Sequence, residues 1–400
     1  MRGLRAAGAA VGAVVLAVLS APAPARAANV CETVAQPLAV AKAVPVEDQV
    51  YAPKRLAPLA TGAGVRVAVI DSGVDATVPQ LRGRVARGAD FLHGDDSGRQ
   101  DCIGHGTAVA SIIAAAPVPE SGFQGLAPGV TIVPVRISEQ TEIDGKAVGA
   151  RGSPADFAAA INWAVTDGNV QVINLSLVMT AKNDAVRDAV ARAIAAGIVV
   201  VAAAGNHGDE LNGGPLPFPA AYDGVIGVGA ITPDGVRAAY SQHGSYVDLT
   251  AIGDRVTVAA LRGGHRTDQG TSFAAPFVSA TAALIKQRFP DATPAEVFQR
   301  LTATADPAPG GEKSDEYGLG LLNPFRAVTE SLGVQRPPAA PVVMPRDDPA
   351  AIALAQRREH SRDMALLFAA IGGGAVVLLG AVAAIVRHGR RRSWAPAGPS

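Results

Sequence analysis

The stretch Gly270-Thr271-Ser272-Phe273-Ala274-Ala275-Pro276 places one serine among small residues at the head of a long apolar run. The run continues through 277–285 with apolar residues on nearly every side, which predicts a buried helix. Pro276 is expected in the first turn of that helix, where its missing N–H costs little. Ser272 would stand at the positive end of the helix dipole, which favours developing negative charge. A capping serine explains the same pattern, so a nucleophilic role depends on finding partners elsewhere.

Strand-like and helix-like segments alternate along the chain on both sides of this stretch. Short β-branched or apolar runs predict strands at 65–70, 131–135, 170–177, 198–203, 225–230 and 246–251. Capping residues, N-terminal prolines and apolar faces predict helices at 105–113, 153–168, 184–196, 270–285, 293–303 and 323–332. This alternation predicts an α/β fold with a doubly wound parallel sheet.

The composition indicates a globular protein. The 400 residues are 48% hydrophobic, which is enough to bury a sizeable core. Lys and Arg together number 35, as do Asp and Glu, so no charge excess points to nucleic acid. We therefore predict no nucleic-acid partner.

The N-terminus has the layout of an export signal. Arg2 and Arg5 precede an uncharged segment at 6–19, and Ala25-Arg26-Ala27 supplies a small-x-small cleavage site. These features predict a signal peptide at 1–27. The following residues, 28–58, contain prolines and show no convincing periodicity, so we expect an extended arm before a folded domain at 59–333.

The C-terminal part is expected to anchor the chain in a membrane. A proline-rich linker and juxtamembrane segment at 334–363 leads to an uncharged stretch at 364–386. At about 1.5 Å per residue this stretch can cross a hydrocarbon core of about 30 Å; a buried core helix is the competing interpretation. The arginines at 387 and 390–392 predict a cytoplasmic tail at 387–400 and a folded domain outside the cell.

The two cysteines, Cys31 and Cys102, are predicted to form a disulfide, because exported chains favour paired cysteines. Such a bond would hold the arm beside His105. On a chain-entropy model it would stabilise the fold by roughly 4 kcal/mol.

The polar loop at 90–101 contains Asp95, Asp96 and Asp101, whose carboxylates suit calcium. Their spacing matches no calcium-loop template, so we expect solvated charges instead. No metal and no cofactor are predicted.

A serine nucleophile needs a base to accept its proton and an acid to orient that base. Of seven histidines, only His105 heads a predicted helix between glycines, where another backbone can approach closely. Asp71 ends the predicted strand at 65–70, and open α/β sheets place their sites at such strand ends. A turn aspartate before Ser72-Gly73 would also explain Asp71. Because the same chain also contains the His105 and Ser272 motifs, we favour the role of orienting acid for Asp71.

The developing oxyanion needs hydrogen-bond donors as well. Asn206 follows the predicted strand at 198–203 through Ala204-Gly205, so its side-chain amide is expected to project over the same site. The backbone N–H of Ser272 is the second predicted donor. An ordinary turn asparagine is the alternative interpretation of Asn206.

Four stretches resemble the Asp, His, Asn and Ser motifs of the subtilisin family of serine proteases, in that family's order. They are Val67-Ala68-Val69-Ile70-Asp71-Ser72-Gly73-Val74-Asp75, Gly104-His105-Gly106-Thr107-Ala108-Val109-Ala110, Ala203-Ala204-Gly205-Asn206 and the opening stretch at 270–276. The resemblance implies a three-layer fold with a largely parallel, seven-stranded sheet between helices. It also implies a serine endopeptidase without a cofactor, with Asp71, His105 and Ser272 as catalytic residues and Asn206 in the oxyanion site.

The same resemblance implies that the substrate pocket lies beside Ser176 and Leu177. In this chain the next residues are Val178 and Met179, where the family usually has glycines. The pocket is therefore expected to differ from the usual one, while no member of the triad is changed.

The ends of the chain resemble more closely the mycosins, the membrane-anchored subtilisin-like proteases of actinobacterial type VII secretion systems. The shared features are a cleaved signal, a cysteine-bearing arm, a single catalytic domain, a proline-rich spacer and one C-terminal membrane helix. This resemblance implies a protein or peptide substrate, a type VII secretion membrane complex as partner and a single-pass location in the cell membrane. The alternatives are a structural subunit of the secretion assembly with little proteolysis and a general surface-tethered degradative protease.

Overall fold

The computed structural model describes residues 36–94, 97–143, 146–210, 214–332 and Arg387. By its internal contacts the chain divides into two units, Met1–Leu332 and Gly333–Ser400. All helices and strands described below belong to the first unit.

The centre of this unit is a seven-stranded sheet with the order β2-β3-β1-β6-β7-β8-β9. Every neighbouring pair in it is parallel. The strands are β1 (Arg66–Asp71), β2 (Ala89–Asp90), β3 (Thr131–Arg136), β6 (Val172–Leu175), β7 (Val199–Ala203), β8 (Ile226–Ile231) and β9 (Leu249–Ile252). The predicted parallel sheet and the seven strands implied by the resemblance are both confirmed.

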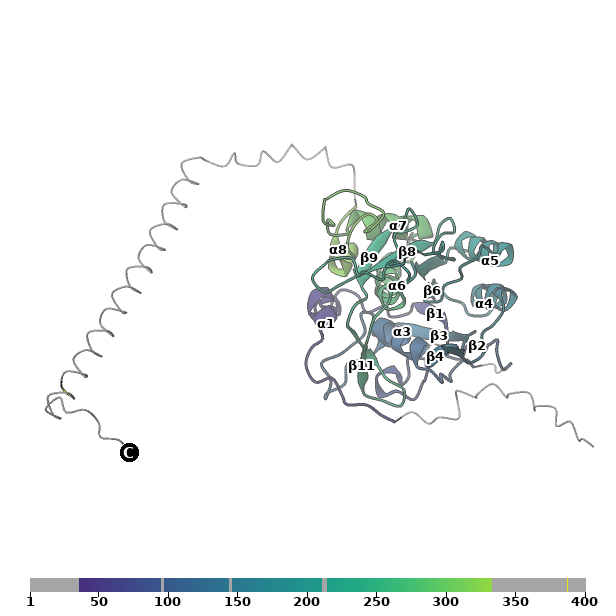
Figure 1. Ribbon diagram of the computed structural model, residues 1–400, viewed down its shortest axis with the longest axis horizontal. Helices are drawn as coiled ribbons and strands as arrows, with labels where there is room; N and C mark the ends of the chain where they lie inside the picture. Colours follow the sequence, from purple (N-terminus) through teal and green to yellow (C-terminus); the bar gives the residue numbers. More distant parts are fainter. Residues whose placement is uncertain (1–35, 95–96, 144–145, 211–213, 333–386, 388–400) are drawn as a thin grey trace, which may run out of the picture. The chain divides into compact units, whose positions relative to one another are not determined.

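Helices cover both faces of this sheet, so the fold has three layers (Figure 1). On one face lie α4 (Pro154–Thr166) and α5 (Asp184–Ala195), and on the other lie α3 (His105–Ala114) and α6 (Thr271–Arg288). Side chains of β1 alternate between the two cores: Val67 and Val69 belong to the α3 and α6 side, and residues 68 and 70 to the other. Burial on both faces explains why these strands are continuous apolar runs.

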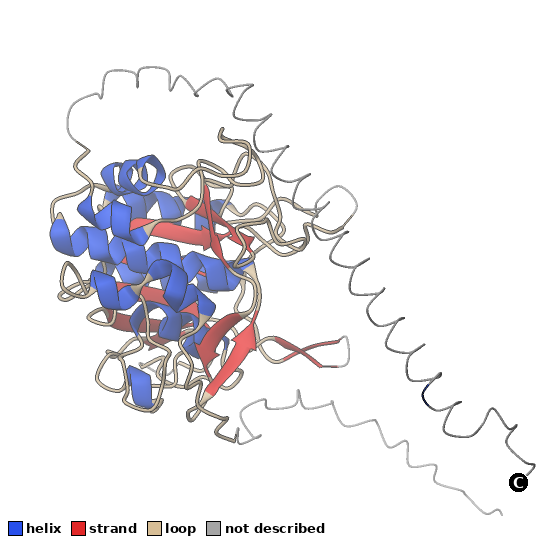
Figure 2. Cartoon of the chain, turned by 90° about the vertical axis from the view of Figure 1, so that its left-hand side faces the viewer, coloured by secondary structure: helices blue, strands red, loops and turns tan. Residues whose placement is uncertain are grey.

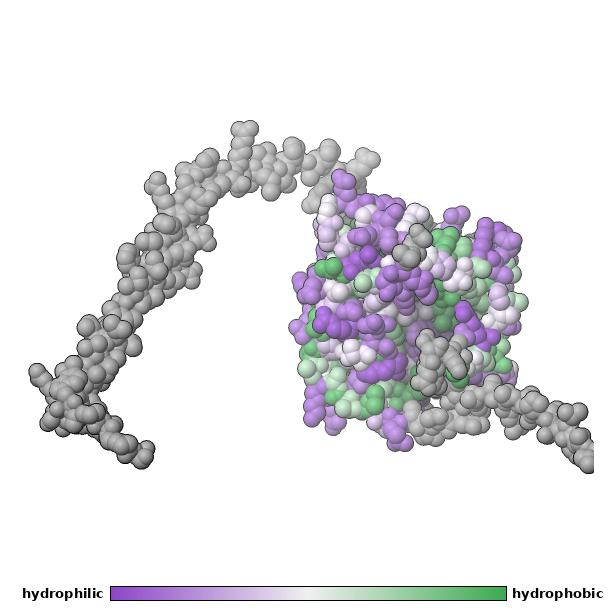
Figure 3. Space-filling model, in the orientation of Figure 1, coloured by the Kyte–Doolittle hydropathy of each residue, from purple (hydrophilic) through white to green (hydrophobic). Residues whose placement is uncertain are grey.

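Smaller elements complete the unit. The helical ones are η2 (Pro79–Leu81), α7 (Pro294–Ala303) and α8 (Pro324–Thr329), and the extended ones are the antiparallel pairs β10 (Val256–Ala259) with β11 (His265–Asp268) and β4 (Thr141–Ile143) with β5 (Lys146–Val148). Figure 2 shows the β4–β5 hairpin projecting from the body. Hydrophilic and hydrophobic residues are interspersed on the face drawn in Figure 3.

Helix α6 is the buried helix expected from the opening stretch. Its residues 271–285 are all buried, and it packs against α3 and the strands β6 to β9. The helix begins at Thr271 with Gly270 as its N-cap, and no side chain caps it. Ser272 is therefore not a capping residue. The expected place of Pro276 in the first turn is wrong, because Pro276 lies inside the helix, four residues after Ser272.

The sequence predicts an extended N-terminal arm, but the arm is only partly extended. It contains two short helices, α1 (Val46–Tyr51) and α2 (Pro53–Leu56), joined by Ala52 in a left-handed conformation. Helices of this length are unstable alone, so tertiary contacts must hold them. One such contact is the hydroxyl of Tyr51, which accepts a 2.8 Å hydrogen bond from the Ile252 N–H.

Two buried carboxylates of α1 fasten the arm to the body. Glu47 accepts a hydrogen bond of 2.7 Å from the Thr257 N–H, and Asp48 accepts one of 3.0 Å from the Gln124 N–H. Before α1, the main chain at residues 38–39 pairs with residues 263–265 through two 3.0 Å hydrogen bonds. Acceptors on the arm thus satisfy N–H groups that lie far away in sequence.

Several predicted segments lie outside the described residues: the signal peptide at 1–27, Cys31, the linker at 334–363, the anchor at 364–386 and nearly all of the tail at 387–400. Among the helices of the described ranges, none is both long and apolar enough to cross a membrane.

Stability is expected to depend on pH through Asp48. Burial raises the pKa of Asp48 from its usual 3.8 to about 7, so the folded protein holds a proton that the unfolded chain releases. The contribution of this proton to the free energy of unfolding is full below about pH 4 and is lost as the pH rises through about 7. We predict that Asp48→Asn, which keeps an oxygen acceptor for Gln124, raises stability at pH 8 by roughly 2–4 kcal/mol and changes it little at pH 4. Urea unfolding of the purified protein at pH 4, 5 and 8 measures this.

The control is Asp156→Asn, which removes an exposed carboxylate from the N-terminus of α4. Hydrogen bonds from Ser153 lower the pKa of Asp156, so it stays ionised between pH 5 and 8. Its loss should shift stability equally at pH 5 and pH 8. An unchanged pH slope in Asp48→Asn would contradict the prediction.

Candidate active site

Asp71 and His105 meet at the end of the first strand. Asp71 is the last residue of β1 and is fully buried, and His105 is the first residue of α3. The Asp71 Oδ1 lies 2.7 Å from the His105 Nδ1 and also accepts a 2.7 Å hydrogen bond from the Ser72 N–H. This contact fixes the ring so that Nδ1 faces the carboxylate and Nε2 is left for another partner.

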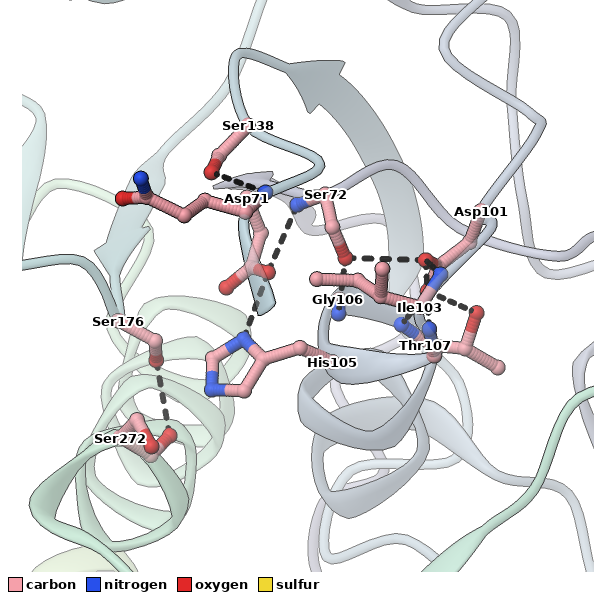
Figure 4. Close-up of polar contacts among 12 residues, drawn as sticks. Asp71, Ser72, Asp101, Ile103, His105, Gly106, Thr107, Ser138, Ser176 and Ser272 are labelled. Atoms are coloured by element: carbon pink, nitrogen blue, oxygen red, sulfur yellow. Dashed lines mark hydrogen bonds and ion pairs between the residues drawn. The ribbon is translucent and has the colours of Figure 1, made fainter. Parts of the chain in front are cut away.

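Ser272 lies on the other side of the His105 ring (Figure 4). It is the second residue of α6, and the ring of its neighbour Phe273 packs against the imidazole with centroids 5.3 Å apart. His105, Ser272 and Asn206 all line one open pocket of about 240 Å³. The structure therefore brings together the four residues that the sequence singled out.

Asn206 is oriented by Thr271, for which the sequence predicts no role. Its Oδ1 accepts hydrogen bonds from both the N–H and the hydroxyl of Thr271, at 2.8 and 2.9 Å. The amide Nδ2 is consequently left to face the pocket. Thr271 stood beside Ser272 in the opening stretch, but only the fold shows that its partner is Asn206.

The Nδ2 of Asn206 and the Oγ of Ser272 converge beside Gly270. A Cβ atom added at Gly270 would lie 3.0 Å from Ser272 Oγ and 3.2 Å from Asn206 Nδ2. Gly270 also has a φ of 147°, which L side chains rarely adopt. Glycine at this position keeps the space between the two groups open.

Asp101 is not solvated, which corrects the expectation from the acidic loop. It is buried, and its carboxylate accepts hydrogen bonds from the N–H groups of Gly104 and Thr107, both at 2.8 Å, and from the hydroxyl of Thr107. The hydroxyl of Ser72 also donates to Asp101 and accepts from the Gly106 N–H. The physical reason is that Gly104, the N-cap of α3, has no side chain to satisfy these N–H groups. Asp101 thereby holds His105 in place.

The pKa of His105 is set by opposing effects. Burial lowers it, but the charge and hydrogen bond of Asp71 and the charges of Asp101 and Asp268 raise it, and the net change is upward. Burial also raises the pKa of Asp101, against the hydrogen bonds that it accepts, and the Asp71 charge adds to this. The site therefore favours a positively charged imidazole.

The two residues predicted to bind substrate take different positions. Leu177 lines the catalytic pocket and a neighbouring pocket of about 320 Å³. Ser176 also lines the catalytic pocket, but its hydroxyl donates a 2.8 Å hydrogen bond to the Ser272 carbonyl. The side chain of Ser176 is thus directed at α6.

The predicted disulfide and the acidic loop are only partly described. The pairing of Cys102 with Cys31 remains a prediction, because Cys31 lies outside the described residues, as do Asp95 and Asp96. In the part of the chain that is described, no group of three or more His, Cys, Asp or Glu side chains is arranged to hold a metal ion.

Comparison with known proteins identifies relatives over most of this unit. Residues 62–320 match the model of the subtilase family of peptidases. Mycosin-1 of Mycobacterium tuberculosis (strain ATCC 25618 / H37Rv) is 36% identical over 315 residues, covering 68% of this chain and 70% of that protein. Subtilisin E of Bacillus subtilis (strain 168) is 36% identical over 275 residues, covering 69% and 68%.

A solved structure gives a similar result. The serine protease MycP1, described as an essential component of the type VII (ESX-1) secretion system, superposes with a TM-score of 0.63 at 33% sequence identity. The match covers 74% of this chain and 91% of the MycP1 chain.

We predict that Asp101→Asn lowers the pKa of His105, because it removes a negative charge that favours the imidazolium. Asp268→Asn should lower it less. NMR titration of the His105 ring measures both changes. Asp156→Asn on α4 serves as the control and should leave the titration unchanged. An unaltered pKa in Asp101→Asn would contradict the electrostatic role.

Proposed function

The chain belongs to the subtilase family of serine endopeptidases, and we propose that it cleaves peptide bonds with Asp71, His105 and Ser272 as its catalytic triad. The observation that carries this assignment is the 2.7 Å contact of buried Asp71 with His105, which lines the same pocket as Ser272. An acid, a base and a nucleophile in this order are what acyl transfer requires.

In this mechanism the Oγ of Ser272 attacks the peptide carbonyl while the Nε2 of His105 accepts its proton. Asp71 holds the Nδ1–H and stabilises the imidazolium that forms, which agrees with the raised pKa of His105. His105 then gives the proton to the leaving amine, and the acyl group stays bound to Ser272. Water, deprotonated by the same His105, hydrolyses this acyl-enzyme and releases Ser272.

The negative charge that develops on the carbonyl oxygen is stabilised by two donors. One is the Nδ2 of Asn206, which Thr271 turns toward Ser272. The other is the N–H of Ser272, which has no acceptor within the helix because it belongs to the first turn of α6. Both lie at the positive end of the helix dipole.

The substrate is proposed to be an extended protein or peptide segment. The catalytic pocket and the neighbouring pocket of about 320 Å³ share lining residues, so one peptide can reach both. The residues common to both are Ser138, Arg151, Leu177 and Val178. Leu177, together with Phe157 and Met179 in the second pocket, favours an apolar side chain near the cleavage site.

We further propose that this protease works at the outer face of the cell membrane within a type VII secretion complex. The support is the likeness to mycosin-1 and MycP1, together with the predicted signal peptide at 1–27, linker at 334–363 and anchor at 364–386. The predicted Cys31–Cys102 disulfide would fasten the start of the arm in that oxidising compartment. The tail at 387–400 would remain in the cytoplasm.

The peptidase assignment predicts covalent labelling by a fluorophosphonate. The wild-type protein should be labelled at Ser272, and Ser272→Ala should not be labelled by the same reagent. Asn206→Ala should lower kcat by roughly 10²–10³-fold, the effect measured for an oxyanion asparagine of subtilisin. Persistent labelling of a folded Ser272→Ala protein would sink the assignment of the nucleophile.

A structural role in the secretion assembly is the second candidate, because the related MycP1 is described as an essential component of such a system. We expect secretion to fail both in a deletion strain and in a strain that carries Ser272→Ala, if proteolysis is what the assembly needs. Secretion assays on the two strains, with membrane levels of the variant checked by immunoblot, decide this. Failure in the deletion strain alone would show that the fold acts as a structural subunit.

A further inference from the structure

Helix α6 lacks one main-chain hydrogen bond, the one that the carbonyl of Ser272 would accept. In an α-helix the N–H of each residue bonds to the carbonyl four residues earlier. Pro276 lies inside α6 and has no N–H, so the carbonyl of Ser272 loses its helical donor. This carbonyl is attached to the proposed nucleophile, and Ser272 is a buried residue.

Ser176 supplies the missing donor from another element. Its hydroxyl donates to the Ser272 carbonyl at 2.8 Å, as drawn in Figure 4. Ser176 follows directly after β6 and is only 5% exposed. The bond therefore joins the start of α6 to the end of a central strand, whereas the usual helical bond would join α6 only to itself.

A second pair of hydrogen bonds fixes the direction of the Ser176 hydroxyl. The Nδ2 of Asn174 donates to Ser176 Oγ at 2.9 Å, and the Oδ1 of Asn174 accepts from the hydroxyl of Ser279 at 2.8 Å. A serine hydroxyl has a single proton, so with Asn174 as its donor Ser176 directs that proton to Ser272. Asn174 and Ser279 are fully buried, and the chain of bonds ties α6 to β6 at two points.

Strand β6, which Ser176 directly follows, is the direct neighbour of the strand that carries Asp71. Strand β6 pairs in parallel with β1, and Leu175 is in register with Ile70. Ser176 and Asp71, the next residues, thus stand side by side at the ends of neighbouring strands. The same sheet register that places the acid also places the group that holds the nucleophile.

We propose that Ser176 is a positioning residue for Ser272. Its hydroxyl replaces the helix bond that Pro276 eliminates, and so fixes the peptide group that carries Ser272 relative to His105 and Asn206. The proposal rests on the peptidase function and assigns the Ser176 side chain to the nucleophile, in place of the substrate-binding role expected from the sequence.

The test uses the full chain and its peptidase activity. Ser176→Ala should lower kcat by roughly 10- to 100-fold and slow fluorophosphonate labelling similarly, with KM changed less than about twofold, because a small displacement of a reacting atom has effects of this size. A hydroxyl that only lined the substrate pocket would change KM instead. A rise in KM with kcat unchanged would therefore overturn the proposal.

A rescue experiment separates positioning from simple loss of a contact. In Ser176→Ala the Ser272 carbonyl has lost its donor, and adding Pro276→Ala restores a main-chain N–H at the right position. The kcat of the double variant should be at least about tenfold higher than that of Ser176→Ala, because residues that share one interaction typically show a coupling of this size. Failure of a folded double variant to recover any activity would contradict the mechanism.

Thr281→Val is the matched control, because the Thr281 hydroxyl is also buried on α6 but bonds to the Phe277 carbonyl of the same helix. It should leave kcat unchanged, and a loss equal to that of Ser176→Ala would overturn the proposal.

If Ser176→Ala does not fold, Ser279→Ala takes its place. We then expect a few-fold loss of kcat, and an unchanged kcat would contradict the proposal. Labelling of the wild-type protein keeps the two questions apart: an unlabelled wild type refutes the peptidase function, whereas full-rate labelling of Ser176→Ala refutes only the positioning role.

Discussion

Both faces of the central sheet are covered by helices, so a strand such as β1 can present a charged side chain only where it ends. Asp71 occupies that position, fully buried and compensated by His105 and by the Ser72 N–H. Because β1 pairs directly with β6, the end of β6 lies beside it and supplies Ser176. The parallel register thus gathers a carboxylate and a hydroxyl at one edge, and the first residues of α3 and α6 bring the His105 imidazole and the Ser272 hydroxyl to the same place.

The carboxylates of Asp71 and Asp101, near His105, accept hydrogen bonds from main-chain N–H groups. Asp101 receives N–H groups from the first turn of α3, and Asp71 receives the Ser72 N–H, so each carboxylate is paired without a lysine or arginine from the described residues being needed. Buried carboxylates of this kind stabilise a nearby cation, and both raise the pKa of His105. The start of α3 therefore combines two functions, capping a helix and keeping the imidazole ready to become charged.

The sequence was sufficient to predict the sheet and the buried α6, because both depend on local patterns. The convergence of Asp71, His105, Asn206 and Ser272 was predictable because strand ends of a parallel sheet meet at one edge and because the four motifs resemble those of one family. The burial of Asp101 was missed because charge and loop composition do not reveal which N–H groups lack a cap. Helices α1 and α2 were missed because they are too short to carry a periodic signal and are held by groups more than 200 residues away, such as the Thr257 N–H. The link from Ser176 to Ser272 likewise depends on tertiary structure, although Pro276 was visible in the sequence.

The docking of the N-terminal arm also has a consequence for the order of folding. The Tyr51 hydroxyl and the Ile252 N–H are separated by 201 positions in the chain, and the partner of Glu47 by 210. Contacts of such long range require most of the intervening chain to be in place, since closing the loop costs entropy before the contact forms. These two contacts of α1 can form only once the chain around Ile252 and Thr257 is in place, whereas the contact of Asp48 with the Gln124 N–H spans only 76 positions and can form earlier.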